Sequence, residues 1–275
     1  MSATPELHLI DLDQDLPGQR RFISCWTSVS DDLTFVVDPG PASTADHLVA
    51  ELDKLGVERL GFILLTHVHL DHGGCTAGIL ERFPGAKVVC SERGWPHLID
   101  PSRLWEGSKK VLREKALAYG EPKPVPESAL ATQEEAAARG LATIPTPGHA
   151  AHHVAFQHGA HLFLGEAAGT YSTLGRGSDT PDYYLRPATP PRFILETALA
   201  SIDRLLDLEP APERLAFAHH GLLTGQTREL LQASREQHDH WVATVRDVRS
   251  GDPDQEFESL AAQVVDRLIA NDPWF

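Results

Sequence analysis

Three histidines and one aspartate stand within six positions of the stretch THVHLDHGG, residues 66–74, directly after the apolar run FILL. Polar groups that leave water at the end of a buried strand need partners, and a metal ion suits imidazole and carboxylate together. Side chains at alternate strand positions point the same way, so His67 and His69 should converge on one ion. We expect Asp71 and His72 in the following turn, directed at a second point nearby. The stretch therefore predicts a metal site, against the alternative of a helix start with incidental histidines.

Size and charge limit the classes of protein to consider. With 275 residues, of which 41% are apolar, the chain can form one large α/β domain or two modest ones. The formal net charge of −15 disfavours binding to nucleic acid or to an anionic membrane, and no run of Lys or Arg offsets it. We therefore expect a small-molecule substrate, no nucleic-acid partner and no membrane partner, and the sequence leaves a homodimer open.

The cysteines and the first residues indicate a cytoplasmic protein. Cys25, Cys75 and Cys90 have no paired spacing, which favours free thiols in a reducing compartment over a disulfide framework. Residues 1–16 contain acids and lack both the basic start and the apolar stretch of a signal peptide. No stretch of the sequence has the length and hydrophobicity of a membrane span.

The elements that must position the metal site alternate along the first hundred residues. Short apolar runs are typical of strands buried on both faces, and the segments between them carry helix caps and stops. A region rich in helix formers and proline follows, then more strands and helices, the last two helical stretches being split by the breaker GDPD. The expected elements are strand 33–40, helix 43–56, strand 60–67, helix 74–85, strands 86–92, 141–149, 152–158 and 161–166, helix 192–208, strand 213–221, and two helical stretches within 227–275.

The two halves of the chain show a weak internal echo. In the first half a strand ends in Asp38, a helix follows, and the next strand ends in His67. In the second half a strand ends in Glu166, a helix follows, and the next strand ends in His219 and His220. Two similar half-sheets that each deliver ligands from strand ends would face each other across one site.

The pattern HxHxDH after a buried strand resembles the signature of the metallo-β-lactamase-fold hydrolase superfamily. The resemblance spans about residues 7–225 and implies an α/β (α+β) fold, a four-layer αββα sandwich with metals at the edge of its two sheets. The domain expected from it covers residues 1–225, with a helical insertion at about 93–135 and a C-terminal helical extension over 226–275.

The resemblance implies further ligands on later strands. The segment TPGH offers His149, and the glycine before it would let the backbone turn sharply. The family usually has an aspartate that bridges both metals where this chain has Glu166, which could bridge, hold one ion only, or act from outside the ligand set. Alternation sends His219 and His220 to opposite faces, so only one of them should reach the metals. The resemblance to the family variant in which histidine, any residue and glycine follow an apolar strand selects His219, with His220 as the rival. Two divalent ions are implied, zinc in first place and iron or manganese as alternatives. The implied ligand set is His67, His69, Asp71, His72, His149, Glu166 and His219.

A second group of residues should support the ligands or contact the substrate. Asp38 would orient a ligand histidine, or it would only cap a turn. His152 and His153 begin a strand, so at most one of them can face the cleft, and a structural role suits either. In the glycine- and proline-rich segment 169–191, aromatic and cationic side chains could position a substrate carboxylate. The candidates are Asp38, His152, Tyr184 and His220, with His153, Tyr171, Tyr183 and Arg186 beside them.

The predicted chemistry is metal-dependent hydrolysis of an ester-like bond. A metal-activated water or hydroxide would attack a polarised carbonyl, and Asp71 would orient the nucleophile or pass a proton to the leaving group. The C-terminal helices are reminiscent of the thioesterase-like branch similar to hydroxyacylglutathione hydrolase, which implies a small thioester or lactone. Two alternatives belong to other classes: an iron-dependent oxidoreductase similar to the persulfide dioxygenases, and a weakly active metal-binding or sensing protein of the same fold.

Overall fold

The first half of the chain forms a five-stranded sheet whose strand order follows the sequence. The structure, a computed structural model, describes residues 6–173, 183–251 and 256–275. β1, β2 and β3 are antiparallel neighbours, whereas β3, β4 and β5 run parallel. The strands are β1 (Glu6–Asp11), β2 (Ser24–Val29), β3 (Phe35–Val37), β4 (Phe62–Leu64) and β5 (Lys87–Val89).

The second half forms another five-stranded sheet, in the order β12-β11-β8-β7-β6. β6, β7 and β8 are antiparallel neighbours, β8 and β11 run parallel, and β12 returns antiparallel beside β11. A separate two-stranded ribbon pairs β9 with β10. The strands are β6 (Ala142–Pro145), β7 (Val154–His158), β8 (His161–Gly165), β9 (Thr170–Ser172), β10 (Tyr184–Arg186), β11 (Arg214–Phe217) and β12 (Gly221–Thr224).

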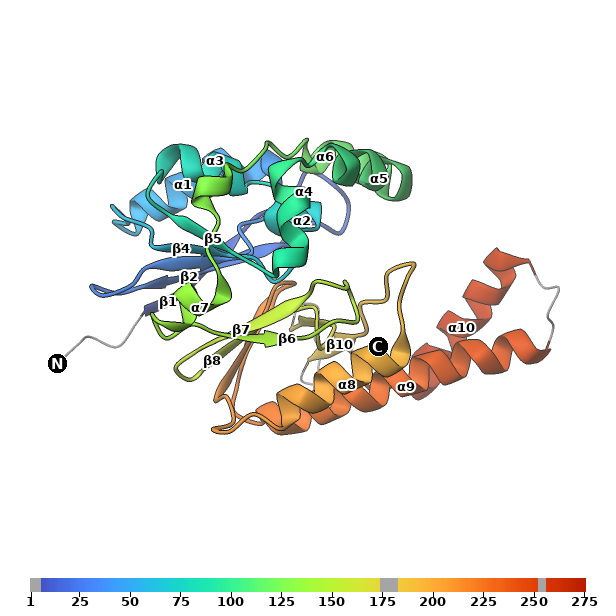
Figure 1. The fold of residues 1–275 in the computed structure, drawn as a ribbon. Helices are drawn as coiled ribbons and strands as arrows, with labels where there is room; N and C mark the ends of the chain where they lie inside the picture. Colours follow the sequence, from blue (N-terminus) through green and yellow to red (C-terminus); the bar gives the residue numbers. More distant parts are fainter. Residues whose placement is uncertain (1–5, 174–182, 252–255) are drawn as a thin grey trace.

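Helices cover the outer face of each sheet, so the fold is the expected four-layer αββα sandwich (Figure 1). α1 and α3 lie over the first sheet, and α8 and α9 lie along the second. A parallel strand pair needs a crossover connection, which α1 supplies between β3 and β4 and α8 supplies between β8 and β11. These helices are α1 (Ala45–Lys54), α3 (Thr76–Arg82), α8 (Leu195–Leu206) and α9 (Thr227–Gly251).

Apolar clusters hold the four layers together, one between the sheets and one beneath each outer helical layer. Between the sheets, Phe35 of β3 meets Phe156 and Phe163 of the second sheet, and the rings of Phe35 and Phe163 stand edge to face at 5.8 Å. Alternate residues of the same strands, such as Val36 and Ile63, pack in the other cluster with the helices. Because both faces of β3 and β4 are buried, their sequences are continuous apolar runs.

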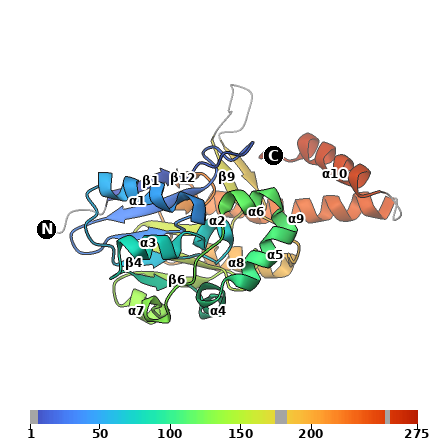
Figure 2. The ribbon, with the colours of Figure 1, turned by 90° about the horizontal axis from the view of Figure 1, so that it is seen from above.

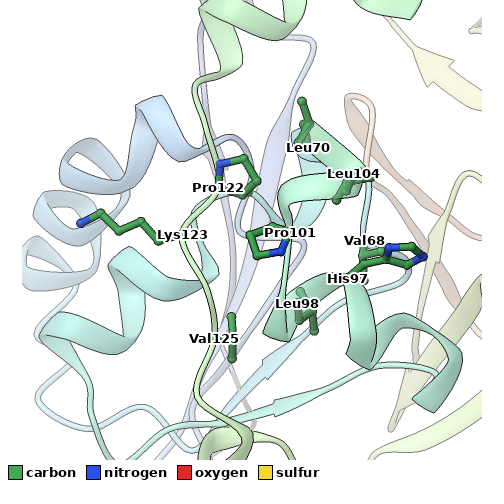
Figure 3. Close-up of a pocket in the computed structure, with 11 residues that line it drawn as sticks. Val68, Leu70, His97, Leu98, Pro101, Leu104, Pro122, Lys123 and Val125 are labelled. Atoms are coloured by element: carbon green, nitrogen blue, oxygen red, sulfur yellow. The ribbon is translucent and has the colours of Figure 1, made fainter. Parts of the chain in front are cut away.

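The region expected as an insertion at about 93–135 consists of short helices that pack against the histidine-rich segment. Figure 3 shows a small pocket at this contact, where Val68 and Leu70 face Leu98 and Leu104. The insertion therefore supports the metal-site segment with an apolar surface. Its elements are η2 (Glu92–Gly94), α4 (Trp95–Ile99), α5 (Ser102–Leu112), α6 (Glu114–Tyr119), η3 (Glu127–Ala129) and α7 (Gln133–Ala137).

The C-terminal residues form two helices, α9 and α10 (Phe257–Asn271), which extend beyond the sandwich (Figure 2). α10 packs on α9 through a small apolar cluster that contains Val248, Val264 and Leu268. Residues 252–254 of the breaker GDPD lie outside the described residues. No helix in the described part of the chain combines the length and the hydrophobicity needed to cross a bilayer. The domain boundary at about residue 225 stays a prediction.

The sequence does not predict five of the strands: β1, β2, β9, β10 and β12. Strand β2, SCWTSV, has neither a strict polar–apolar alternation nor a continuous apolar run, and β9, β10 and β12 have only three or four residues each. Such strands form because a neighbouring strand pairs with them, and local propensity contributes little.

Candidate metal centre

Seven side chains that the sequence singles out come together in two adjoining clusters. The first cluster consists of His67, His69, His149 and Glu166, and the second of Asp71, His72 and His219. Within each cluster the potential ligand atoms all lie within 4.8 Å of one another. All seven side chains come from segments that follow the carboxyl ends of β4, β6, β8 and β11.

The segment after β4 supplies four of the seven side chains. His67 Nε2 and His69 Nδ1 lie 2.9 Å apart, which fits the predicted convergence of alternate residues. Asp71 and His72 lie in the single-turn helix α2 (Leu70–Gly73), which forms the turn expected after the strand. The turn closes helically because the backbone N–H of His72 donates to the carbonyl oxygen of His69 at 3.1 Å. Both side chains still reach one place, with His72 Nε2 3.8 Å from Asp71 Oδ2.

His149 follows β6 in the turn TPGH. Gly148 has a φ of +152°, and a Cβ there would lie 2.9 Å from the Cα of Ala198 in α8, so the turn needs glycine. His149 Nδ1 lies 3.2 Å from the carbonyl oxygen of Ala188, and an N–H donated there leaves Nε2 with its lone pair. That Nε2 lies 3.0 Å from Glu166 Oε2. The turn therefore aims His149 at the first cluster.

Glu166, in the place of the family's usual aspartate, lies between the two clusters. Its Oε2 is 3.3 Å from the Nε2 atoms of both His67 and His72, and its Oε1 is 3.2 Å from His219 Nε2. The preceding Gly165 has a φ of +54°, and a Cβ there would lie 2.5 Å from the nearest side-chain atom. One carboxylate therefore contacts both clusters, which is the geometry that a bridging role requires.

The two histidines that follow β11 point in different directions. His219 stacks on Phe22 with ring centroids 4.3 Å apart, and its Nδ1 lies 3.2 Å from the Phe22 carbonyl oxygen. Its Nε2 then faces the second cluster, 3.7 Å from Asp71 Oδ2. His220 has a φ of +58°, and its Nε2 lies 3.6 Å from Asp11 Oδ1 at the end of β1. The geometry thus favours His219 over His220 as the last ligand.

Asp38, at the end of β3, lies behind two of the histidines. Thr66 donates its backbone N–H to Asp38 Oδ1 at 2.8 Å and its hydroxyl to Oδ2 at 2.7 Å. Thr66 Oγ1 in turn lies 3.1 Å from His67 Nδ1, and Asp38 Oδ2 lies 3.2 Å from His72 Nδ1. The Thr66 oxygen can accept an N–H from His67 Nδ1, and the charge of the nearby Asp38 carboxylate favours a proton on His72 Nδ1, so both Nε2 atoms are left for a metal. The carboxylate is 2% exposed and does more than cap a turn.

His152 and His153 hold the backbone of the site. The N–H of Val68 donates to His152 Nε2 at 3.1 Å, and burial lowers the pKa of His152 to about 4, so the acceptor is neutral at pH 7. The N–H of Glu166 donates to His153 Nε2 at 3.2 Å, while His153 Nδ1 lies 2.8 Å from Thr146 Oγ1. Burial also holds the pKa of His153 well below its ordinary value. Both imidazoles are engaged by the segments that carry ligands.

The buried polar atoms of the site fit metal ions. Glu166 Oε2 and His72 Nε2 lie 3.3 Å apart, yet both are buried without a hydrogen-bond partner among the described residues. These two atoms lie close together without forming a hydrogen bond to each other. Both can instead point at a common space, as the ligand atoms of a metal ion do. Burial alone would raise the pKa of Glu166, but the charges of His149 and His219 hold it well below its ordinary value. Burial and neighbouring imidazoles lower the pKa of His67. An ionised carboxylate and a neutral imidazole are the forms that bind metal.

A cavity of about 290 Å³ opens beside His219, between the loop that joins β1 to β2 and the ribbon β9–β10. Tyr184 and Arg186 line it, as the position of their segment suggests, and Tyr171 lines it from β9 while stacking on Phe217. The sequence does not predict the contribution of the loop, because β2, the strand after it, carries no strand signal of its own. The lining residues from the loop are Gly18, Arg20, Arg21 and Phe22.

Comparison with known proteins places the chain in one superfamily. A sequence model of the metallo-beta-lactamase superfamily matches residues 18–219. The metallo-beta-lactamase fold-containing protein ST1585 of Sulfurisphaera tokodaii is 29% identical over 206 residues, which cover 72% of each chain. A hydroxyacylglutathione hydrolase of Cupriavidus taiwanensis is 31% identical over 189 residues, 67% of this chain and 58% of that protein.

A solved structure agrees with the sequence matches. The crystal structure of ST1585, from an organism given there as Sulfolobus tokodaii, superposes with a TM-score of 0.66 at 23% identity, over 85% of this chain and 86% of that one. At this level of identity the likeness establishes the fold alone.

Proposed function

The chain belongs to the metallo-beta-lactamase superfamily of hydrolases, and from this premise we propose that it uses divalent metal ions to cleave a small-molecule thioester or lactone. The observation that carries the proposal is that Glu166 lies between a cluster of three histidines and a cluster of one aspartate and two histidines. A site that served only to stabilise the fold through ion pairs would not need seven side chains of metal-binding type around one buried space.

In this proposal the first cluster would hold one metal ion and the second cluster would hold another, and both ions would share Glu166. When bound, the ions would polarise the substrate carbonyl and lower the pKa of water towards neutrality. Imidazole and carboxylate ligands suit zinc, and iron and manganese accept the same set. The ligand set is His67, His69, His149 and Glu166 for one ion and Asp71, His72, His219 and Glu166 for the other.

Asp71 is the group proposed to handle protons. Its side chain is 19% exposed, against 2% for His72 and 3% for His219, so it is the member of the second cluster that water and substrate can reach. In hydrolysis the oxygen of water bonds to the acyl carbon, the carbon–sulfur or carbon–oxygen bond breaks, and one proton of the water ends on the leaving group. The Asp71 carboxylate can orient the water and pass on that proton.

The choice of a thioester or lactone rests on two features. The similarity to a hydroxyacylglutathione hydrolase, whose name states the hydrolysis of an acyl group carried on sulfur, supports a thioester. The cavity of about 290 Å³ beside His219 has the size of a small-molecule site, for which about 300–1,000 Å³ is typical, and supports a small substrate.

The test combines metal analysis with a substrate panel. Protein loaded with zinc, manganese or iron should bind close to two equivalents of metal and hydrolyse members of an acyl-thioester and lactone panel, and chelation should abolish the activity reversibly. His69→Ala should lose both metal and activity, whereas the exposed His47→Ala should keep them. Oxygen uptake by the iron form without hydrolysis would replace the proposal with an oxidoreductase, and metal binding without either reaction would point to a sensing role.

A further inference from the structure

The cavity beside His219 has a composition that the rest of the chain does not share. Three of its eleven lining residues are the arginines Arg20, Arg21 and Arg186, and none of the described residues that line it is acidic. The whole chain, in contrast, has 39 acidic and 24 basic residues. The lining of this cavity is therefore positive in a protein that is negative overall, and such a pocket attracts anions.

One wall of the cavity is a loop held in place by buried polar residues. Gln19 accepts a hydrogen bond from the hydroxyl of Tyr119 in α6 at 2.9 Å, and Gln14 accepts one from Ser43 at 3.1 Å. The backbone N–H of Gln14 also donates to the carbonyl oxygen of Gln19 at 3.3 Å, which closes the loop. The next residue along is Arg20, so its backbone is fixed even though its side chain is exposed.

The opposite wall is strand β10, which is fixed from behind. Leu185 is fully buried, its N–H donates to the Trp274 carbonyl oxygen at 3.0 Å, and its carbonyl oxygen accepts from Gln237 Nε2 at 2.6 Å. Because neighbouring residues of a strand point to opposite faces, Tyr184 and Arg186 then face the cavity.

Two of the three arginines are not neutralised by an acidic side chain of the described residues. Arg21 lies 3.7 Å from Asp11 Oδ2 and is partly neutralised, but Arg20 and Arg186 form no ion pair within the described part of the chain. The Arg186 guanidinium lies over the Phe275 ring, 4.9 Å from its centroid. That contact occupies one face of the guanidinium and leaves its N–H edge available to a carboxylate or phosphate.

We propose that this cavity selects substrates that carry an oxyanion, either a carboxylate or a phosphate, on the part remote from the bond that is cleaved. Arg20 and Arg186 bind this oxyanion. This inference rests on the proposed hydrolase function, because it assigns the substrate class of the same site. His219 belongs both to the second cluster and to the cavity wall, so a compound whose carbonyl lies at the cluster extends towards the arginines.

The test compares three thioesters that share the S-acetyl-thioethyl part and differ in the group at its end: S-acetyl-3-mercaptopropionate, its neutral methyl ester, and S-acetyl-2-mercaptoethyl phosphate. With the zinc-loaded protein we expect kcat/KM to be at least about tenfold higher for an anionic member than for the neutral one, since a hydrogen bond to a charged group has that effect or more. In the double variant Arg20→Gln/Arg186→Gln this ratio should fall to near one, mainly through KM. The carboxylate and phosphate members identify which anion is preferred.

Two further variants separate charge from structure. Arg186→Lys keeps the charge and should keep most of the preference. Arg59→Gln removes one exposed charge just before β4, at the opposite end of the strand that leads to the site, and should leave the ratio unchanged. A ratio near one in the parent protein, or an unchanged ratio in the double variant, overturns the inference.

A binding measurement distinguishes failure of this inference from failure of the proposed function. The thioether that carries the carboxylate but no scissile carbonyl is titrated calorimetrically into the zinc-loaded parent protein and into the double variant. If neither thioester nor lactone is hydrolysed but the thioether binds the parent and not the double variant, the hydrolase proposal fails and the anion site stands. Hydrolysis without any charge preference, together with equal thioether binding, leaves the hydrolase and removes the anion site.

Discussion

The two halves of the molecule have the same strand plan and use it differently. In β1-β2-β3-β4 and in β6-β7-β8-β11 the neighbours pair antiparallel, antiparallel and then parallel, and a helix crosses over within each parallel pair. The echo in the sequence corresponds to this plan: the parallel pair ends in Asp38 and His67 in the first half and in Glu166 and His219 in the second. The pairing within the two five-stranded sheets diverges at the fifth strand, which is parallel in β5 and antiparallel in β12.

The difference lies in how the ligands are delivered. The first half supplies four side chains from one continuous segment, whereas the second supplies His149, Glu166 and His219 from three separate strand ends. The acids at equivalent strand ends also have different roles: Asp38 contacts the histidines from behind, and Glu166 reaches between the two clusters. The comparison teaches that one backbone plan can place an acid either within a metal site or in its support, depending on the length and direction of one side chain.

The sharpest way to break this comparison is to remove the acid that reaches the centre. Glu166→Gln takes away the only carboxylate that contacts both clusters in the described structure. We expect bound metal to fall below one equivalent and hydrolysis to fall by more than about 100-fold, beyond the range known for groups outside the ligand set. Metal analysis and steady-state kinetics check this, with the exposed Glu121→Gln as control. Full metal content in Glu166→Gln would show that the carboxylate is not a ligand.

The equivalent acid of the first half should matter less. Asp38→Asn keeps the shape but weakens the partners of His67 and His72, so metal affinity or activity should fall by about 10–100-fold while metal still binds. A competition titration with a chelator of known affinity measures the change. If Asp38→Asn were as damaging as Glu166→Gln, the distinction between the two acids would be lost.

A third variant tests the support of the second half. His153→Ala leaves the Glu166 N–H and the Thr146 hydroxyl without their partner in the core. Each unsatisfied buried group costs about 1–3 kcal/mol, so the free energy of unfolding should fall by at least that amount. Urea denaturation of the metal-free protein provides the number, compared with the exposed His47→Ala. Equal stability of the two variants would contradict the assigned hydrogen bonds.

The smallest expected effect concerns His152, which accepts the Val68 N–H in the ligand segment of the first half, and this effect depends on pH. The pKa of His152 is lowered by burial from an ordinary 6.5 to about 4, so the unfolded chain binds a proton in a range where the folded chain does not. The stability that neutral His152 contributes is therefore complete above about pH 6.5 and is lost as the pH falls towards 4. His152→Gln, which cannot titrate, should flatten part of this loss in metal-free protein. If the stability of the parent protein and of His152→Gln depended on pH in the same way, the pKa of His152 would not be lowered in the folded protein.

Part of this protein can be predicted from the sequence because it is locally encoded. The segment THVHLDHGG carries four ligand candidates within six positions, and the runs that form β3 and β4 are apolar because both faces are buried. Gly148 and Gly165 also mark their turns, since the backbone at each adopts a positive φ. Period, spacing and residue type are sufficient for these features, as each depends on a few neighbouring residues.

Only the tertiary structure decides the rest. Whether Glu166 lies between the clusters, whether His219 or His220 turns inwards, and which arginines meet across the cavity depend on strands brought together from positions up to two hundred residues apart. Loop residues such as Arg20 have no local pattern, because their location is set by the pairing of β1 with β2 and by a buried tyrosine from a distant helix. The sequence determined which chemistry the chain can hold, and the packing of its two sheets decided which side chains take part, since direction and distance arise only when the halves meet.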